Sequence, residues 1–171
     1  MACCLFSTNR SYRCSSSCYP CPIFYSNNNC NCQNGAIVNP VVLPSFAFFS
    51  LTTPTEVTAG AVVPLALVTN SGTAISSTTA GFATLATGTY EAIYSVTSEI
   101  GAGGVNTFGL SLGGTTIPAS VSTSTGAAGA QTTVGNSVIF TVGTPTTLAL
   151  NNLAVDTVTV NNANLTIRKI N

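Results

Sequence analysis

The stretch Gly88-Thr-Tyr-Glu-Ala-Ile-Tyr-Ser-Val-Thr-Ser-Glu99 decides how this chain folds. Its even positions from 90 to 96 are apolar, and its odd positions are polar apart from Ile93, which is the period-two pattern of a strand with one buried face. Gly88 supplies a turn before the strand, and the run Ile-Gly-Ala-Gly-Gly104 ends it. The pattern therefore predicts a central strand of an all-β domain.

Short runs of the same kind follow one another from Ser45 onward, separated by turns rich in Gly, Asn and Thr. No stretch keeps apolar residues at helical spacing, so we expect helices to be nearly absent. Many short strands with regular turn signals indicate an antiparallel jelly-roll sandwich. Strands are predicted at residues 46–51, 62–68, 74–77, 81–85, 89–98, 107–112, 115–118, 120–124, 131–134, 137–142, 146–150, 156–160 and 164–170.

The composition favours self-association and excludes several classes of partner. Charged residues make up 5% of the 171 residues, against roughly 25% in an ordinary soluble domain. The formal net charge is +0, so copies of the chain repel one another little. Only Arg10, Arg13, Arg168 and Lys169 could neutralise phosphates, which makes nucleic acid a poor partner. No apolar run reaches the roughly 18 residues of a membrane span.

Cysteine usage divides the chain in two. All seven cysteines lie in the first 32 residues, and the count is odd, so at least one thiol stays free or pairs with another chain. We interpret residues 1–37 as a Cys-rich N-terminal connector, 38–44 as a Pro-rich linker and 45–171 as the jelly-roll domain. The candidates for disulfides between chains are Cys3, Cys4, Cys14, Cys18, Cys21, Cys30 and Cys32.

Four interpretations of these cysteines remain open. Structural disulfides, some between chains, are favoured, and Cys3-Cys4 is the pair best suited to bridge outward because neighbouring cysteines rarely bond each other. A four-thiolate zinc site from Cys18-Tyr-Pro-Cys21 and Cys30-Asn-Cys32 is disfavoured by the C-x-C spacing. Redox catalysis lacks a βαβ context. The remaining interpretation is a tail whose oxidation is incidental. We expect neither a metal nor another cofactor.

The sequence argues against an enzyme. It contains no histidine, so neither a Ser-His-Asp nor a Cys-His arrangement can form. Its glycine-rich runs carry no basic partner and are interpreted as turns rather than phosphate-binding loops. Lys169, which could form an isopeptide bond, is interpreted as solvated beside Arg168. The four carboxylates are scattered and are interpreted as solvated or capping groups: Glu56, Glu91, Glu99 and Asp156.

Four segments resemble one known family. They are Phe46-Ala-Phe-Phe-Ser50, Gly88-Thr-Tyr-Glu91, Gly135-Asn-Ser-Val-Ile-Phe-Thr141 and Asn164-Leu-Thr-Ile-Arg-Lys-Ile-Asn171. Together they resemble the C-terminal domain of the BclA-like collagen-like glycoproteins of bacterial spore surfaces, which is itself similar to the C1q and tumour necrosis factor jelly roll. The resemblance covers about residues 44–171 and implies a compact trimer. The residues expected in the protomer core or at the trimer axis are Tyr90, Tyr94, Val96, Phe108, Leu110, Phe140, Leu165 and Ile167.

The N-terminal part departs from that family, because no Gly-X-Y collagen stalk precedes the domain. The Cys-rich connector resembles instead the subunits of endospore appendages, fibres in which N-terminal cysteines cross-link successive subunits. The first residues lack the basic and apolar regions of a secretory signal, which fits spore proteins that are exposed when the mother cell lyses. Aromatic residues expected to dock the connector on a neighbour, or to pack around its disulfides, are Phe6, Tyr12, Tyr19, Phe24 and Tyr25.

The sequence thus predicts a structural subunit that trimerises and polymerises into a disulfide-cross-linked extracellular fibre on a spore or cell surface. Its partners would be copies of itself, stacked or helically arranged, with other spore-surface proteins in addition. The alternative is a trimeric C1q-like head, anchored to the spore surface, that recognises a receptor or a carbohydrate.

Overall fold

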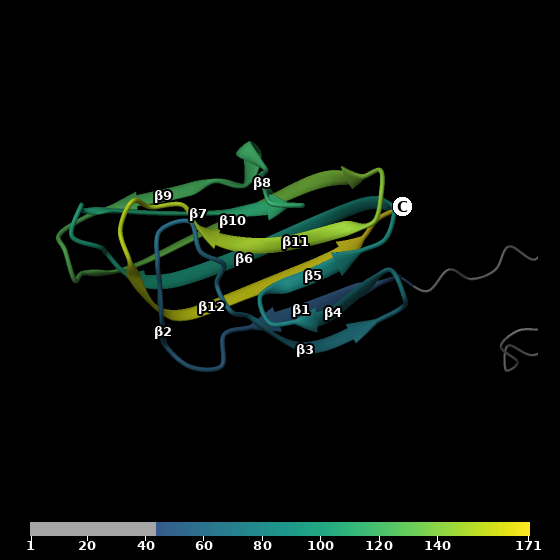
Figure 1. The fold of residues 1–171 in the computed structure, drawn as a ribbon, viewed down its shortest axis with the longest axis horizontal. Coiled ribbons are helices and arrows are strands. Elements are labelled where there is room, and N and C mark those ends of the chain that lie inside the picture. The colour runs from purple at the N-terminus through teal and green to yellow at the C-terminus, as the bar shows by residue number, and fades with distance from the viewer. Residues whose placement is uncertain (1–43) are drawn as a thin grey trace, which may run out of the picture. The chain divides into compact units, whose positions relative to one another are not determined.

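Two antiparallel six-stranded sheets pack face to face in the computed structural model, which describes residues 44–171 (Figure 1). Sheet I has the order β10-β6-β12-β1-β3, with β2 added beside β12. Its strands are β1 (Phe46–Ser50), β2 (Thr55–Val57), β3 (Ala66–Ser71), β6 (Gly88–Glu99), β10 (Gln131–Val142) and β12 (Val158–Lys169).

Sheet II has the order β4-β5-β11-β7-β8, with β9 added beside β7. The one helical element in the described residues is a 3₁₀ turn, η1 (Pro118–Ser120). The strands of sheet II are β4 (Ile75–Thr79), β5 (Phe82–Leu85), β7 (Val105–Leu112), β8 (Thr115–Thr116), β9 (Ser122–Thr125) and β11 (Thr146–Asn152). The predicted antiparallel jelly-roll sandwich is confirmed, and β6 lies between β10 and β12 as expected for a central strand.

Two breaks that the sequence predicts, after residue 134 and after residue 160, are absent from the structure. Each position lies inside one long strand. Residues 131–134 and 137–142 belong to one strand, β10. A Cβ atom at Gly135 would lie 2.6 Å from the Tyr94 carbonyl oxygen, so this glycine permits a close approach of β10 to β6 rather than a turn. Residues 156–160 and 164–170 are likewise joined in β12, with a bulge between Val160 and Asn162.

Other boundaries were wrong for local reasons. The strand predicted at 62–68 begins only at Ala66, because Pro64 has no N–H to donate to a ladder, and Val62 forms just an isolated bridge with Asn151. The strand predicted at 115–118 ends at Thr116, after which Pro118 opens η1. The short strand β2 was not predicted, since three residues are too few to show a period.

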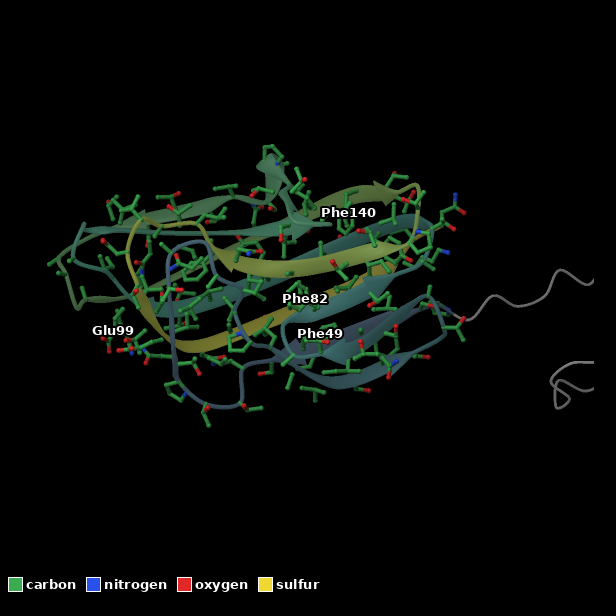
Figure 2. The ribbon with its side chains drawn as sticks, viewed as in Figure 1. Phe49, Phe82, Glu99 and Phe140 are labelled. Atoms are coloured by element: carbon green, nitrogen blue, oxygen red, sulfur yellow. The ribbon has the colours of Figure 1, made fainter. Side chains whose placement is uncertain are left out.

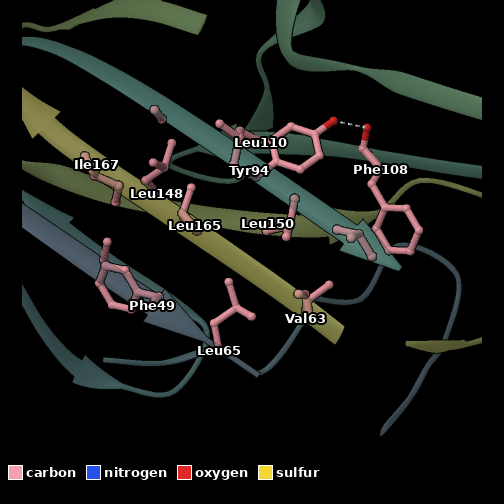
Figure 3. Packing of buried hydrophobic residues seen from close by; sticks show 14 of the residues in the cluster. Phe49, Val63, Leu65, Tyr94, Phe108, Leu110, Leu148, Leu150, Leu165 and Ile167 are labelled. Atoms are coloured by element: carbon pink, nitrogen blue, oxygen red, sulfur yellow. Dashed lines mark hydrogen bonds between the residues drawn. The ribbon is translucent and has the colours of Figure 1, made fainter. Parts of the chain in front are cut away.

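The core lies between the sheets and is built from the inward positions of both (Figures 2 and 3). Of the eight residues expected in the core or at a trimer axis, all but Phe140 are buried inside the protomer. Phe140 is partly buried and stacks on Tyr90, with ring centroids 6.1 Å apart. The seven buried side chains face the opposite sheet and are not available to a second copy of the chain, whereas Phe140 keeps part of its surface exposed.

Tyr94 links the two sheets through its hydroxyl group (Figure 3). The Oη atom lies 2.7 Å from the Ser120 carbonyl oxygen and 3.0 Å from that of Phe108, and it can donate its proton to either. Burial raises the pKa of Tyr94 to about 12. Burial also raises the pKa of Tyr90, against the smaller opposing effect of its hydrogen bond to Ala86.

The Tyr94→Phe substitution is expected to lower the free energy of unfolding by about 1 kcal/mol at neutral pH, because two buried carbonyls lose their donor. In the wild type, the raised pKa stabilises the fold below the ordinary tyrosine pKa near 10, and this contribution is lost as the pH rises through about 12. Between about pH 10 and about pH 12, the free energy of unfolding should therefore fall less for the variant than for the wild type. Urea unfolding of both proteins at neutral and alkaline pH measures this, and parallel pH profiles would contradict it.

Candidate self-association surface

The solvent-facing side of sheet I carries an unusual set of exposed apolar side chains. Strand alternation points Ala47 and Phe49 into the core and leaves their neighbours outward. The exposed fractions of the outward side chains at 46, 93, 139 and 170 are 41%, 46%, 63% and 51%, which are large for apolar residues. We call the following set the apolar sheet face: Phe46, Phe48, Ile93, Ile139 and Ile170.

The strand register places four of these residues, all but Ile170, in two outward rows of one sheet. One outward row crosses four strands. Ile139 on β10 pairs with Glu91 on β6, and Glu91 pairs in turn with Arg168 on β12. Arg168 then pairs with Phe46 on β1. The next outward row runs from Ile93 through Thr166 to Phe48. Cross-strand neighbours lie about 5 Å apart. Residues from four strands that are distant in sequence therefore form one continuous surface.

One ion pair lies inside this surface. The Arg168 Nε atom bonds the Glu91 carboxylate across β6 and β12, between Ile139 on one side and Phe46 on the other. The Arg168 side chain is 65% exposed, and that of Glu91 only 17%. Together with Ile93 and Thr166 the pair lines a surface hollow. Because the two charges satisfy each other, the surface can meet another protein without leaving an isolated charge unpaired.

The other half of the same sheet surface is polar. Outward positions there carry hydroxyl and amide groups, and the Thr97 and Thr133 hydroxyl oxygens lie 2.8 Å apart. Glu56 and Glu99 flank Thr159 at the far end. Only the half of this face near the start of β1 and the C-terminus is therefore suited to an apolar contact.

Strand β10 is an edge of sheet I that is covered only in part, where the Asn136 Nδ2 atom donates to the Ala119 and Val121 carbonyl oxygens at 3.1 and 3.4 Å. Its twelve residues contain no charge and no proline, and they pair with β6 without a bulge. The edge strand β3 at the other side is half as long and carries a bulge opposite Phe48 and Phe49. Natural sheets usually shield long edges with charges, proline or bulges. The part of β10 beyond Asn136 has none of these three devices and lies beside the apolar sheet face, which makes it a candidate for contact with protein.

The point where residue 45 enters β1 lies at the same end of the sandwich as the C-terminus (Figure 1). The Lys169 N–H donates to the Ser45 carbonyl oxygen at 2.8 Å, and the Thr89 N–H donates to that of Asn171 at 2.7 Å. Ser45 is 7% exposed. The chain is thus fixed to sheet I immediately before Phe46, the first residue of the apolar sheet face.

Two carboxylates of the described domain have partners within the chain. Glu91 is paired with Arg168, and the Asp156 Oδ2 atom accepts the Gly103 N–H at 2.6 Å. Within residues 44–171 no group of three or more candidate ligands could hold a metal ion. In the same residues no helix is long and apolar enough to cross a membrane.

The sequence pattern did not identify the residues of the apolar sheet face as a site. The signal was present in Ile93, the single apolar residue among the polar positions of its strand, and in Ile139 at the equivalent outward position of β10. The seven cysteines and the connector aromatics at positions 6, 12, 19, 24 and 25 lie outside the described residues. Their predicted roles remain predictions.

No family model and no curated protein sequence matches this chain. Solved structures match residues of the domain at low identity. The globular domain of zebrafish complement 1qA protein gives a TM-score of 0.61 at 11% identity and covers 74% of this chain and 98% of its own. Murine APRIL gives a TM-score of 0.61 at 12% identity and covers 75% of this chain and 100% of its own. Eiger TNF from S. frugiperda gives a TM-score of 0.60 at 13% identity and covers 75% of this chain and 94% of its own. These matches identify the fold as a C1q/TNF-like jelly roll.

Proposed function

We propose that this chain is a non-enzymatic structural subunit. Copies associate through the apolar sheet face into a trimer, and the Cys-rich connector cross-links them into an extracellular fibre on a spore or cell surface. The observation that carries the proposal is the gathering of Phe46, Ile93, Ile139 and Ile170 on one face of one sheet. Single exposed apolar residues are ordinary, whereas several on one sheet face, around an ion pair whose charges satisfy each other, favour a contact surface.

Burial supplies the driving force for this association. Fully burying a large apolar side chain stabilises by about 1.5–3 kcal/mol, and each copy offers five that are exposed or partly exposed. The domain carries few charges, so little electrostatic repulsion opposes the contact. The Glu91–Arg168 pair does not oppose the contact, because its two charges satisfy each other within one copy.

A closed ring of three follows if the contact joins two different surfaces. The β10 edge of one copy can pack on the apolar sheet face of the next, and such a head-to-tail contact closes when the rotation allows it. The resemblance of the sequence to the trimeric BclA-like and C1q domains supports three copies. The fold similarity to the complement 1qA domain is consistent with this number.

The connector supplies the permanent link. A non-covalent contact opens at a rate set by its affinity, whereas disulfides persist outside the cell, where the environment is oxidising. Seven cysteines in the first 32 residues, and none in the domain, place all covalent chemistry in the part that precedes the sandwich. The spore or cell surface is the location that the resemblance supports.

Boiling the oxidised full-length protein in SDS, with and without reductant, tests this proposal. Without reductant we expect a ladder of species or material retained in the well, because covalent links survive the detergent. With reductant we expect the monomer alone. A monomer in both lanes would exclude a cross-linked fibre.

A second candidate is suggested by the same C1q/TNF-like fold. In this alternative the trimer is a binding head that recognises a receptor or a carbohydrate, and the connector only attaches it to the spore surface. The hydroxyl-rich half of sheet I offers the hydrogen-bonding groups that a carbohydrate requires. Isolated trimeric particles in electron micrographs of oxidised protein would favour this candidate over the fibre.

A further inference from the structure

We propose that the Arg168 guanidinium of one copy donates hydrogen bonds to backbone carbonyl oxygens on the free edge of β10, at residues 138–142, in the next copy. Arg168 would then select which strand of the neighbouring copy the apolar sheet face accepts. This inference rests on the proposed function and deepens it, because it names the segment that the face binds and the residue that selects it.

The ion pair within the apolar sheet face presents donors to the solvent and hides its acceptors. The Arg168 side chain is 65% exposed, whereas that of Glu91 is only 17% exposed. A guanidinium carries five N–H groups, and a bidentate pair with one carboxylate uses two of them. At least three N–H groups of Arg168 are therefore left for an acceptor outside the pair. A neutral peptide carbonyl suits them, because a second carboxylate would bring an uncompensated charge.

These donors lie in a hollow between apolar side chains. Ile139 stands on one side of the ion pair and Phe46 on the other, with exposed fractions of 63% and 41%. In the next outward row the Thr166 hydroxyl can accept an N–H group. A strand edge placed here would bury its side chains against the apolar walls and find both donors and an acceptor below it. The hollow is lined by Glu91, Ile93, Thr166 and Arg168.

The second half of β10 carries the acceptors that would match. In an antiparallel pair, alternate residues point their N–H and C=O groups at the partner strand, and the others point away from it. Strand β10 ends sheet I, and among residues 44–171 only β6 pairs with it. The Ser137 N–H is still taken by the Asn136 Oδ1 atom at 2.8 Å. Beyond Ser137, no backbone group of the described residues outside the sheet ladder bonds the main chain at 138–142.

Backbone groups of this kind must be satisfied if the edge is to be covered. A carbonyl that is buried against apolar side chains without a donor costs free energy, so an apolar surface alone is a poor cover for a strand edge. The Arg168 donors remove this cost for a strand that lies over them. The contact therefore requires a partner with a row of unpaired carbonyls.

The other strand edges of the sandwich are shorter or irregular. Strand β3 pairs with β1 through a register shift at Phe48 and Phe49, and β4 pairs with β5 through a shift at Ser76 and Thr79. Strands β8 and β9 have two and four residues. Strand β10 has twelve residues, no charge and one unbroken register. Among the described strands it thus offers the longest regular edge to the Arg168 donors.

Two variants distinguish this role of Arg168 from a purely apolar contact. Arg168→Lys keeps a charge opposite Glu91 but replaces the planar fork with an ammonium group. The Glu91→Leu, Arg168→Leu double variant removes both charges and enlarges the apolar surface. If burial alone held the copies together, the double variant would form a trimer at least as tight as the wild type. We expect both variants instead to weaken each contact by about ten- to a hundredfold.

Light scattering of the reduced full-length proteins during serial dilution measures the strength of the trimer, and urea unfolding checks that each variant is folded. Lys169→Arg is the matched control, because it exchanges the neighbouring cation in the reverse direction. The Lys169 side chain lies against Gly88 at the end of the sheet, away from the ion pair. This control should dissociate at the same concentration as the wild type.

Hydrogen exchange of the reduced wild type and of the Ile93→Asp variant identifies the strand that is covered. Alternate amides of residues 138–142 should be protected more strongly in the trimer than in the variant. Protection gained at β3 or β4 instead, or a trimer that both Arg168 variants leave as tight as before, overturns this inference and leaves the trimer intact. A wild type that is monomeric when reduced overturns the inference and the proposed function together.

Discussion

Replacing Ile93 with aspartate is expected to convert the reduced protein from a trimer to a monomer. Ile93 is 46% exposed in the single chain and lies between Thr166 and Ser137 on the apolar sheet face. An uncompensated charge buried in a contact costs about 3–5 kcal/mol, which weakens each contact roughly 10²- to 10⁴-fold. Size-exclusion chromatography with light scattering in reductant measures the change.

The matched control is Val155→Asp, the same change of chemistry at a side chain that is 86% exposed in the loop between β11 and β12. This variant should remain a trimer. Both variants should keep the far-ultraviolet spectrum and melting temperature of the wild type to within a few degrees, because exposed substitutions rarely change stability by more than about 0.5 kcal/mol. A trimeric Ile93→Asp variant would show that the copies meet elsewhere.

Replacing all seven cysteines with serine is expected to abolish every SDS-resistant species while leaving the reduced trimer unchanged. The domain contains no cysteine, and the core cluster of the described residues runs from Ala47 to Ile167. Its stability in urea should therefore equal that of the reduced wild type. Non-reducing gels, light scattering and urea unfolding of the two proteins measure the three properties.

An Arg10→Ser, Arg13→Ser variant is the control for this second prediction, because it alters the connector and retains its thiols. It should cross-link as the wild type does. If the cysteine-free variant still formed filaments that withstand boiling in SDS, the covalent links would have to come from other residues, and the isopeptide chemistry considered for Lys169 would need to be tested.

The fold could be predicted from the sequence because strand alternation is a local signal. Positions 90, 92, 94 and 96 alternate with polar residues, and all four side chains are buried in the structure. The failures have local causes as well. Gly135 was interpreted as a turn, although it serves a close approach to Tyr94, and Pro64 was placed inside a strand that it interrupts.

The candidate surface could not be predicted in the same way, because it depends on register. Ile139 and Phe46 flank the Glu91–Arg168 ion pair because the register of β10, β6, β12 and β1 places them there. Spacing along the chain does not contain that alignment. The resemblance to trimeric domains predicted that copies associate, but it placed residues such as Tyr90 at the core or the axis without distinguishing the two.

The most direct test of the whole account is electron microscopy of the oxidised full-length protein, imaged before and after reduction. The account predicts filaments built of repeated globular units, which separate into trimers in reductant because the non-covalent contact outlasts the disulfides. Isolated particles of one size under oxidising conditions, with no filaments at any protein concentration, would contradict it.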